Sequence, residues 1–562
     1  MMPRIVCLSS QPTGSLALPA EILDRVIFYI ISLRDLLALA LTNSALHGAI
    51  IDDHLPYRCV ECHITDDWIW SHLLQVSQRK IENVRLLRID DFTTETVPPR
   101  SRAKVKGSTQ EKPPPSMLTN VLKRTSNLES VLWSRHQTLG LFGKTSIGPD
   151  AFWVALREHC FNLRELHVEC SVDCSHCSVT PERWAPSKMF ELGGLRSLSL
   201  KLSCNNRVTH FYDLKPLCGM LSRCPDLLDL SLSTSDPVRL VLDVTLLTYC
   251  RLPRLKHLFL NQPHFAQGHD FYRFLEAHPA LRTLSMPHAT FQGQAEGTVV
   301  FNNIFQLLPN LRNLCGGPYV VGGLLFPLPT GRRRPLVYVN LVDEGIWPIG
   351  RDTENHEEWM GLLMDEVTRT STLRSLRLEV HLGERQLAPR LSGCESIRRL
   401  EVICLGLQVW DDHVGTDIPN HSVAEMQIFW TESIRHFGNL EVLVMDAGLA
   451  LALRFLSMTE TRESFTRLRS NNTVSAVAIS PKTIAIQHVL EACPHLHSIV
   501  MKPGVGCSVK IAPVGEQVLP SCFPDPPLAW GVINGKYWIL EQMRSDERNR
   551  VLSRVRDAAI IL

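Results

Sequence analysis

The feature that most constrains this chain is an apolar triplet, spaced as Leu-x-x-Leu-x-Leu, that recurs along most of its 562 residues. From Leu163 to Leu311 successive copies begin 32, 32, 28, 26 and 30 residues apart. Such a period is typical of repeat architectures, in which a unit stacks on its neighbours because it cannot bury its apolar face alone. The copies are Val84/Leu87/Ile89, Leu128/Val131/Trp133, Leu163/Leu166/Val168, Leu195/Leu198/Leu200, Leu227/Leu230/Leu232, Leu255/Leu258/Leu260, Leu281/Leu284/Met286, Leu311/Leu314, Leu373/Leu376/Leu378, Ile397/Leu400/Val402, Leu440/Leu443/Met445 and Leu496/Ile499/Met501.

Short helical patterns precede several triplets and end in cysteine or histidine followed by proline, as in Cys224-Pro225, His278-Pro279 and Cys493-Pro494. Proline ends a helix there and turns the chain into an extended segment. Each unit is therefore predicted to contain one helix and one strand. We predict an α/β fold, a solenoid whose curved parallel sheet is covered by outer helices.

The residues between the triplet positions are predicted to project from the concave face of the sheet, because successive strand residues point to opposite faces. Concave solenoid faces commonly bind protein partners, so we expect target contacts there. In the alternative, the face is merely solvated and a loop binds the partner. The expected target contacts are Glu165, His167, Lys201, Asp229, His257, Phe259, Arg377 and Arg399.

A separate helical pattern occupies the first sixty residues. Pro19 suits the first turn of a helix, and apolar residues recur at helical spacing from Ile22 to Ile30. The segment Ser32-Leu33-Arg34-Asp35 has the form of a capping box that opens a second helix. Three helices this short cannot bury all their aliphatic side chains among themselves. The excess is either covered by the repeats or offered to a partner.

This module resembles an F-box of the form found in large fungal families, in the segments Leu18–Leu23, Asp35–Leu39 and His54–Arg58. The Cys-Pro-x-Leu junctions likewise resemble those of leucine-rich repeats in F-box proteins. The resemblance implies docking onto the small Skp-type adaptor of cullin-RING ubiquitin ligases. The positions that would bind the adaptor are Leu18, Pro19, Glu21, Ile22, Leu23, Leu36 and Leu39.

Composition and charge point to an intracellular protein. The net charge of +1 provides no global field for nucleic acid or for an anionic membrane, so neither partner is expected. The 17 cysteines lack regular spacing and are expected to be reduced. No signal peptide is recognisable, and the apolar stretch 26–41 is too short and too interrupted to span a membrane. We expect a cytoplasmic or nuclear location, or both.

Candidate motifs for catalysis and metal binding are incomplete. Gly143-Lys144-Thr145 lacks the first glycine of a phosphate loop, because Thr138 stands at that position. His356-Glu357-Glu358 lacks the second histidine of a zinc helix. The thiol cluster in 170–177 has no second ligand pair near it in the sequence. We therefore expect no enzymatic activity, no catalytic residue, no metal and no cofactor.

The pattern divides the chain into a helical module, two series of repeats and a cap. The second series is the more divergent, and the cap is expected to contain a hairpin near 530–540. The predicted divisions are 15–58 for the F-box module, 59–83 for a connecting helix or linker, 84–315 for regular leucine-rich repeats with a basic disordered loop at 98–115, 316–369 for an irregular insertion, 370–519 for divergent repeats and 520–562 for the C-terminal cap.

Together these expectations describe a substrate-recognition subunit that bridges a Skp-type adaptor, and through it a cullin-RING ligase, to a protein target on the repeats. The chain would be monomeric within that complex. The alternative is a leucine-rich-repeat scaffold with no ubiquitin-ligase connection, in which the helical module packs on its own first repeats. The sequence does not identify the target.

Overall fold

The computed structural model divides into two compact units. The N-terminal unit comprises residues 1–207 and 219–227, and the C-terminal unit comprises 208–218 and 228–562. The division therefore falls at three places in the chain, one of them within α9 (Lys215–Leu221). The structure describes residues 20–30, 33–42, 44–63, 66–91, 115–135, 149–172, 187–204, 210–211, 215–234, 240–243, 247, 249–261, 263–265, 268–291, 307–342, 353–381, 394–405, 433–434, 436–446, 493, 495–496, 498–502, 528–533 and 536–539.

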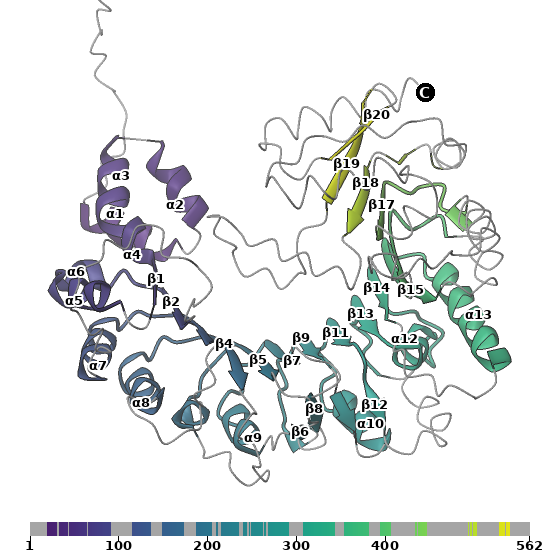
Figure 1. Ribbon diagram of the computed structural model, residues 1–562, viewed down its shortest axis with the longest axis horizontal. Helices are drawn as coiled ribbons and strands as arrows, with labels where there is room; N and C mark the ends of the chain where they lie inside the picture. The colour runs from purple at the N-terminus through teal and green to yellow at the C-terminus, as the bar shows by residue number, and fades with distance from the viewer. Residues whose placement is uncertain are drawn as a thin grey trace, which may run out of the picture. The chain divides into compact units, whose positions relative to one another are not determined.

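The N-terminal unit combines a small helical module with an open parallel sheet in the order β1-β2-β3-β4-β5. Helices α5, α7 and α8 follow one another along one face of this sheet (Figure 1). The module contains α1 (Ala20–Tyr29), α2 (Leu33–Ala40), α3 (Ser44–Ala49), a π-helical turn (Ile50–His54) and α4 (Leu55–Arg58). The sheet and its helices are β1 (Cys59–His63), α5 (Asp67–Gln75), α6 (Gln78–Ile81), β2 (Leu86–Asp91), α7 (Pro115–Arg124), β3 (Ser130–Arg135), α8 (Pro149–His159), β4 (Glu165–Val172), a 3₁₀ turn (Lys188–Glu191) and β5 (Ser197–Cys204).

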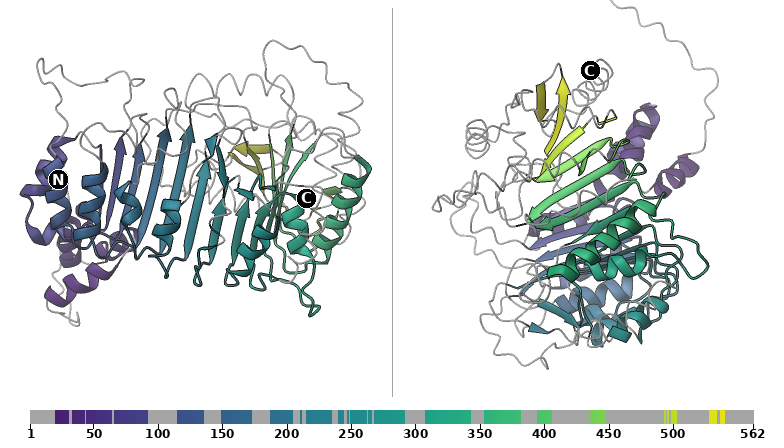
Figure 2. Two further views of the ribbon diagram at one scale, coloured as in Figure 1. Left: turned by 90° about the horizontal axis from the view of Figure 1, so that it is seen from below. Right: turned by 90° about the vertical axis from the view of Figure 1, so that its right-hand side faces the viewer.

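The C-terminal unit continues the same plan. Its parallel strands run in the order β7-β9-β11-β13-β14-β15-β16-β17-β18 without closing, and an antiparallel pair, β19 and β20, follows β18 (Figure 2). A small parallel sheet of order β12-β10-β8-β6 lies beside α10 (Figure 1). The elements are β6 (His210–Phe211), β7 (Asp229–Thr234), β8 (Leu240–Asp243), β9 (His257–Leu260), β10 (Pro263–Phe265), α10 (Gly268–Glu276), β11 (Thr283–Met286), β12 (Thr290–Phe291), β13 (Asn313–Gly316), α12 (Pro318–Leu325), β14 (Tyr338–Leu341), α13 (Thr353–Arg369), β15 (Ser375–His381), β16 (Arg399–Leu405), β17 (Val442–Asp446), β18 (Ser498–Lys502), β19 (Leu528–Ile533) and β20 (Lys536–Ile539).

The triplet residues form the core because the strands pair in register. Leu166 lies opposite Leu198 in the N-terminal unit, and Leu258 lies between Leu230 and Leu284 in the C-terminal unit. All five side chains are buried. The apolar triplet residues of each of these strands thus lie beside the equivalent residues of the next strand. The buried core of these repeats is therefore shared between neighbours. The α/β class and the open parallel sheet predicted from the spacing are confirmed, and they fit a solenoid.

The residue immediately before each strand, which we call the junction position, links the repeats through its backbone. The carbonyl oxygen of Arg164 accepts hydrogen bonds from the N–H groups of Arg196 (2.7 Å) and Ser197 (3.0 Å) in the next repeat. The carbonyl oxygens of Lys256 and Arg374 accept the same two bonds in the C-terminal unit. Both lone pairs of the oxygen are used, so the start of every such strand is fixed to its neighbour.

Several junction side chains strengthen the same boundary. The guanidinium of Arg164 donates to the Gly194 carbonyl (3.3 Å), and that of Arg374 donates to the Ser396 carbonyl (3.2 Å). Both acceptors stand two residues before the next junction position. Arg85 makes the equivalent contact with the Asn127 carbonyl (3.3 Å). These arginines therefore link successive repeats rather than project freely into solvent.

Buried cysteines occupy the turn between helix and strand. The thiol of Cys160 donates to the carbonyls of Leu122 and Thr125 (both 3.8 Å), and the thiol of Cys493 donates to the Ile434 carbonyl (3.4 Å). Each acceptor belongs to an earlier repeat. Burial raises the pKa of Cys160 and of Cys493 to about 12. These buried thiols therefore act as hydrogen-bond donors between repeats.

Arginine side chains also donate hydrogen bonds to the free carbonyl groups at the ends of helices. Arg334 is buried and donates to the Leu324 (2.7 Å) and Phe326 (2.8 Å) carbonyls at the end of α12. Arg124 donates to the Leu73 carbonyl (3.0 Å) in the last turn of α5. The last carbonyls of a helix lack partners within the helix, and a cation there also complements the helix dipole.

Two segments differ from the expected divisions. The segment 59–83, expected to be a connecting helix or linker, contains α5 and α6 but also β1, which pairs with β2 and begins the sheet. The predicted insertion 316–369 contains β14, which lies between β13 and β15, and α12 and α13. Both segments are therefore strand–helix units, because Val60 and Val339 occupy buried triplet positions that leucine fills elsewhere. The expected C-terminal hairpin corresponds to β19 and β20, whereas 98–114 lies outside the described residues.

We predict that Leu258→Ala lowers the free energy of unfolding by about 2–5 kcal/mol, because the side chain is buried between two neighbouring strands and its loss leaves a cavity. Urea unfolding followed by circular dichroism measures the change. Arg273→Ala, at an exposed position of α10, is the matched control and should change the midpoint little. Equal midpoints for the two variants would contradict the proposed core.

We also predict that Cys160, Cys394 and Cys493 resist alkylation in the folded protein. Burial raises the pKa of each thiol to about 12, so at pH 8 only about one in ten thousand is a thiolate. Iodoacetamide labelling read by peptide mass spectrometry tests this, and guanidinium chloride should restore ordinary labelling. Labelling of these residues in the native protein at the rate of a free thiol would be inconsistent with their burial.

Candidate partner-binding surfaces

The helical module carries two exposed apolar stripes. On α1, Ile22, Val26 and Tyr29 are 46%, 46% and 66% exposed. On α2, Leu37 and Leu41 at its end are 43% and 72% exposed. Their spacings of three and four residues place each set on one side of a helix. Grouped exposure of this kind marks an interaction surface, whereas single exposed apolar side chains are ordinary. We call these five residues the apolar stripes.

The residues expected to bind an adaptor are only partly exposed. Ile22 belongs to the apolar stripes, and Leu23 is half-buried. Leu36 is fully buried in the core of the module with Ile27, Ala40 and Ile50, and Leu39 packs against that core. Leu36 thus stabilises the module and is not presented to a partner. The backbone of Glu21 lies in α1, but the structure does not describe its side chain. Leu18 and Pro19 lie outside the described residues.

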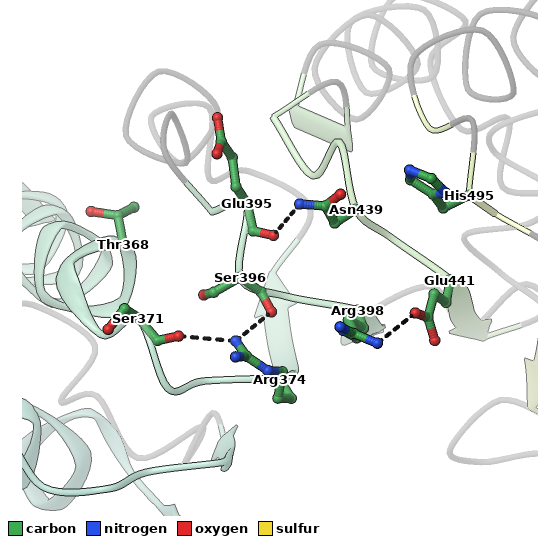
Figure 3. Close-up of a pocket in the computed structure, with 9 residues that line it drawn as sticks. All are labelled: Thr368, Ser371, Arg374, Glu395, Ser396, Arg398, Asn439, Glu441 and His495. Carbon is green, nitrogen blue, oxygen red and sulfur yellow. Dashed lines mark hydrogen bonds and ion pairs between the residues drawn. The ribbon is translucent and has the colours of Figure 1, made fainter.

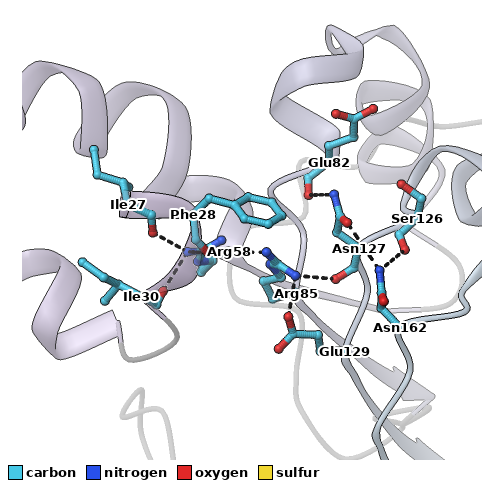
Figure 4. A network of polar contacts seen from close by, with 10 residues as sticks. All are labelled: Ile27, Phe28, Ile30, Arg58, Glu82, Arg85, Ser126, Asn127, Glu129 and Asn162. Atoms are coloured by element: carbon cyan, nitrogen blue, oxygen red, sulfur yellow. Dashed lines mark hydrogen bonds and ion pairs between the residues drawn. The ribbon is translucent and has the colours of Figure 1, made fainter. Parts of the chain in front are cut away.

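Two arginines at junction positions attach α1 to the sheet (Figure 4). The buried guanidinium of Arg58 donates to the carbonyls of Ile27 (2.8 Å), Phe28 (2.7 Å) and Ile30 (2.7 Å) at the end of α1. Arg85 lies over the Phe28 ring, 3.7 Å from its centroid, and forms an ion pair with Glu129. Burial, with a smaller effect from Arg85, lowers the pKa of Arg58 to about 10, so it stays charged at neutral pH.

The contacts continue into the next repeats. Asn127 accepts from Arg85 through its carbonyl and donates through its side chain to the Glu82 carbonyl (3.1 Å). Asn162 donates to the Ser126 carbonyl (3.2 Å). A continuous series of polar contacts therefore runs from the end of α1 along the turns that precede β1, β2, β3 and β4 (Figure 4). The arrangement fixes the apolar stripe of α1 relative to the sheet of the N-terminal unit.

In the N-terminal unit, the expected target contacts lie on β4 and β5. Glu165 is exposed and His167 half-buried, while Lys201 forms an ion pair with Glu169 (2.6 Å). Burial lowers the pKa of His167, and Lys201 adds to this effect while Glu169 opposes it. The structure thus brings two of the three expected residues, His167 and Lys201, together with Glu169 in a small mixed-charge group.

A second group lies at the start of the sheet of the C-terminal unit. His257 is hydrogen-bonded to the Thr283 hydroxyl (3.0 Å) and lies 4.0 Å from the Asp229 carboxylate. Burial raises the pKa of Asp229, although His257 and Lys256 act in the opposite direction. Phe259 is exposed beside them and is the one large apolar side chain of this group. The predicted residues Asp229, His257 and Phe259 are therefore neighbours.

A third polar group on the strand face joins β15 and β16. Arg377 donates to Glu379 (2.8 Å) and lies 3.2 Å from a Glu401 oxygen, while Arg399 lies 3.9 Å from the other oxygen of Glu401. Burial lowers the pKa of Arg377, but Glu401 and Glu379 outweigh burial and raise it overall. Arg377 is thus held within the protein, whereas the partly exposed Arg399 remains accessible.

Three further side chains border this group and were not anticipated. The side chain of Asn340 is buried, and its amide nitrogen donates to the Cys315 sulfur (3.0 Å). The side-chain oxygen of Asn340 has no hydrogen-bond partner among the described residues. Burial raises the pKa of Tyr338 to about 12. Tyr338 and Asn340 belong to β14, which the sequence analysis placed in an insertion. The spacing of Leu336, Val339 and Leu341 is the signal that identifies this strand.

A groove of about 620 Å³ lies at the junction edge of the C-terminal unit (Figure 3). Arg398 in its wall is hydrogen-bonded to Glu441 (3.0 Å), Arg374 to the Ser396 carbonyl, and Asn439 to the Glu395 carbonyl (2.9 Å). These polar side chains are already engaged in contacts between repeats. The groove is therefore the space between successive helix-to-strand turns.

The described residues show neither a metal site nor a membrane span. No group of three or more His, Cys, Asp or Glu side chains among them is arranged to hold a metal ion. The thiols of 174 and 177 lie outside this part of the chain. Within the same described regions, every helix is too short or too polar to cross a bilayer.

Comparison with known proteins leaves the family open. No family model matches this chain, and no curated protein matches it. A solved structure described as "Crystal structure of Rad7 and Elc1 complex in yeast" is similar over 76% of this chain and 89% of that chain, with 12% sequence identity and a TM-score of 0.35. The assignment of function therefore rests on the sequence and geometry of this chain.

We predict that Arg58→Ala loosens the helical module selectively. The substitution leaves three carbonyls at the end of α1 without their donor, at a cost of about 1–3 kcal/mol. Hydrogen exchange with mass spectrometry should show faster exchange in 20–58 and unchanged exchange in β9 and β11. Arg25→Ala, at an exposed position of α1, should leave exchange unaltered. Unchanged protection of α1 in Arg58→Ala would contradict the attachment.

Proposed function

We propose that this chain is an F-box substrate receptor whose leucine-rich repeats present a protein target for ubiquitination. The helical module would dock on a Skp-type adaptor, and the adaptor would connect it to a cullin-RING ligase. The observation that carries this proposal is the pair of apolar stripes on α1 and α2, which lie within the segment that resembles an F-box.

The apolar stripes favour a protein partner of considerable apolar character. Five large side chains remain exposed, four on two helices of ten and eight residues and Leu41 directly after α2, although the module already has its own buried core. Burying them is favourable at about 25 cal/mol per Å² of apolar surface removed from water. The described residues of the repeats leave these side chains exposed, which argues against the alternative in which the module only packs on its own first repeats.

The attachment of α1 through Arg58 and Arg85 suits a positioning role. A substrate receptor accelerates transfer by holding the target where the reacting groups meet, so it requires no catalytic residue of its own. A loosely tethered module would lose much of this advantage. The series of contacts from Phe28 to Asn162 would hold the adaptor at a constant place relative to the first strands.

Target recognition is assigned to the strand face. Phe259 beside His257 offers an apolar anchor with a polar neighbour, and the accessible Arg399 offers a cation. Glu165, at the exposed start of β4, offers an anion. Interfaces commonly combine an aromatic or arginine anchor with a polar rim. We propose a monomeric, non-enzymatic receptor in the cytoplasm or nucleus, bound to one adaptor and one protein target.

We predict that the double substitution Val26→Glu/Leu37→Glu weakens adaptor binding more than tenfold. Each change places a charge in the apolar interface, and a tenfold loss corresponds to about 1.4 kcal/mol. Co-purification with a Skp-type adaptor, followed by calorimetric titration, measures the effect. Leu362→Glu is the matched control, because it makes the same kind of change at an exposed leucine of α13.

Folding is checked by circular dichroism for each variant. A 1:1 complex of the adaptor with the wild-type chain and with Leu362→Glu, lost in the folded double variant, is the expected result. A wild-type chain that does not bind the adaptor would leave the repeat scaffold without a ligase connection as the better description. Equal binding by the double variant would show that the adaptor docks elsewhere.

A further inference from the structure

A basic surface lies on the junction edge of the C-terminal unit, separate from the strand face. It is formed by the turns before three successive strands, β9, β11 and β13. The junction positions of these strands are Lys256, Arg282 and Arg312, and the turn before β9 adds the exposed residues Arg251 and Arg254. We call these five residues the basic junction surface.

The backbone places the three junction cations in a row. The Lys256 carbonyl accepts from the Arg282 N–H (2.8 Å), and the Arg282 carbonyl accepts from the Arg312 N–H (2.8 Å). Neighbouring strands of a sheet are about 4.8 Å apart, so the row spans about 10 Å. The next junction position is Val337, which ends the row at that side.

The turns that carry these residues contain no carboxylate. The segments 250–257, 277–283 and 307–313 have the sequences CRLPRLKH, AHPALRT and LLPNLRN. The later turns differ, because Glu395 and Glu441 lie beside Arg398 there. A local excess of positive charge therefore exists in a chain whose net charge is only +1.

Two of these arginines do not link repeats as other junction arginines do. Arg85, Arg164 and Arg374 each donate to a carbonyl of the following repeat. Among the described residues, the side chains of Arg282 and Arg312 have no such hydrogen bond and no ion pair, and both are exposed. Their guanidinium groups remain available to an external anion.

We propose that the basic junction surface binds an acidic segment of a protein partner. Guanidinium groups bind carboxylates through two parallel hydrogen bonds, and side chains on one side of an extended peptide recur about every 6.7 Å. A short run of alternating acidic residues therefore fits the row of about 10 Å. Tight nucleic-acid binding uses about six to ten phosphate contacts, more than this bounded row supplies. The inference does not depend on adaptor docking.

The test uses the full-length protein and fluorescence anisotropy with a labelled twelve-residue peptide of alternating Glu and Ser. Expected is micromolar binding at 50 mM salt that weakens at 200 mM salt, since exposed charge contacts are screened. Arg282→Glu/Arg312→Glu should weaken binding at least tenfold. Arg273→Glu, a charge reversal at an exposed position of α10, should change it less than twofold.

A peptide of alternating Gln and Ser and a twelve-nucleotide single-stranded DNA are the comparison probes. Absence of wild-type binding, equal binding of the Gln peptide, or undiminished binding by the double variant would overturn the proposal. Tighter binding of the DNA, lost in the same variant, would assign the surface to nucleic acid instead. If Arg282→Glu/Arg312→Glu does not fold, Arg282→Gln/Arg312→Gln replaces it in the test. This variant should also weaken binding of the Glu/Ser peptide.

Discussion

Each repeat depends on its neighbours to bury its apolar side chains, and the rest of this structure follows from that constraint. Leu258 has no complete apolar environment within its own strand–helix unit and obtains one from Leu230 and Leu284 on the adjacent strands. The junction carbonyls add a second constraint, since those of Arg164, Lys256 and Arg374, among others, each accept two N–H groups from the following repeat. Apolar and polar contacts therefore impose the same register. A unit that departed from it would lose both, which explains why β1 and β14 keep the register although their sequences differ from the leucine triplet.

The charged residues divide into those that hold the fold and those that remain available. Arg58, Arg124 and Arg334 satisfy carbonyls at helix ends, where the chain itself supplies no donor. Arg85 and Arg374 connect successive repeats. The charged side chains left over after these contacts include Arg399 on the strand face and Arg282 and Arg312 on the basic junction surface. Together with the uncharged apolar stripes, they are accessible to partners.

Sequence spacing predicted the parallel sheet because a triplet of buried residues leaves a periodic trace. It missed β14, whose triplet is Leu336, Val339 and Leu341 and lies beside glycine and arginine residues that obscure the period. It also predicted Leu36 as a contact residue, whereas Leu36 is buried in the module. Helical spacing shows that apolar residues share one side of a helix, but it does not show which of them are buried in the core and which face a partner. The roles of Arg58 and Arg85 depend on distant backbone carbonyls, and no local pattern reveals them.

We propose that an adaptor binds the two helices that carry the apolar stripes. Hydrogen exchange of the full-length protein with and without a Skp-type adaptor tests this directly, because it reports the location of the contact. We expect slower hydrogen exchange in α1 and α2 when the adaptor is added, and unchanged exchange in β9, β11 and β13. Protection confined to the sheet of either unit, with α1 and α2 unaffected, would contradict it.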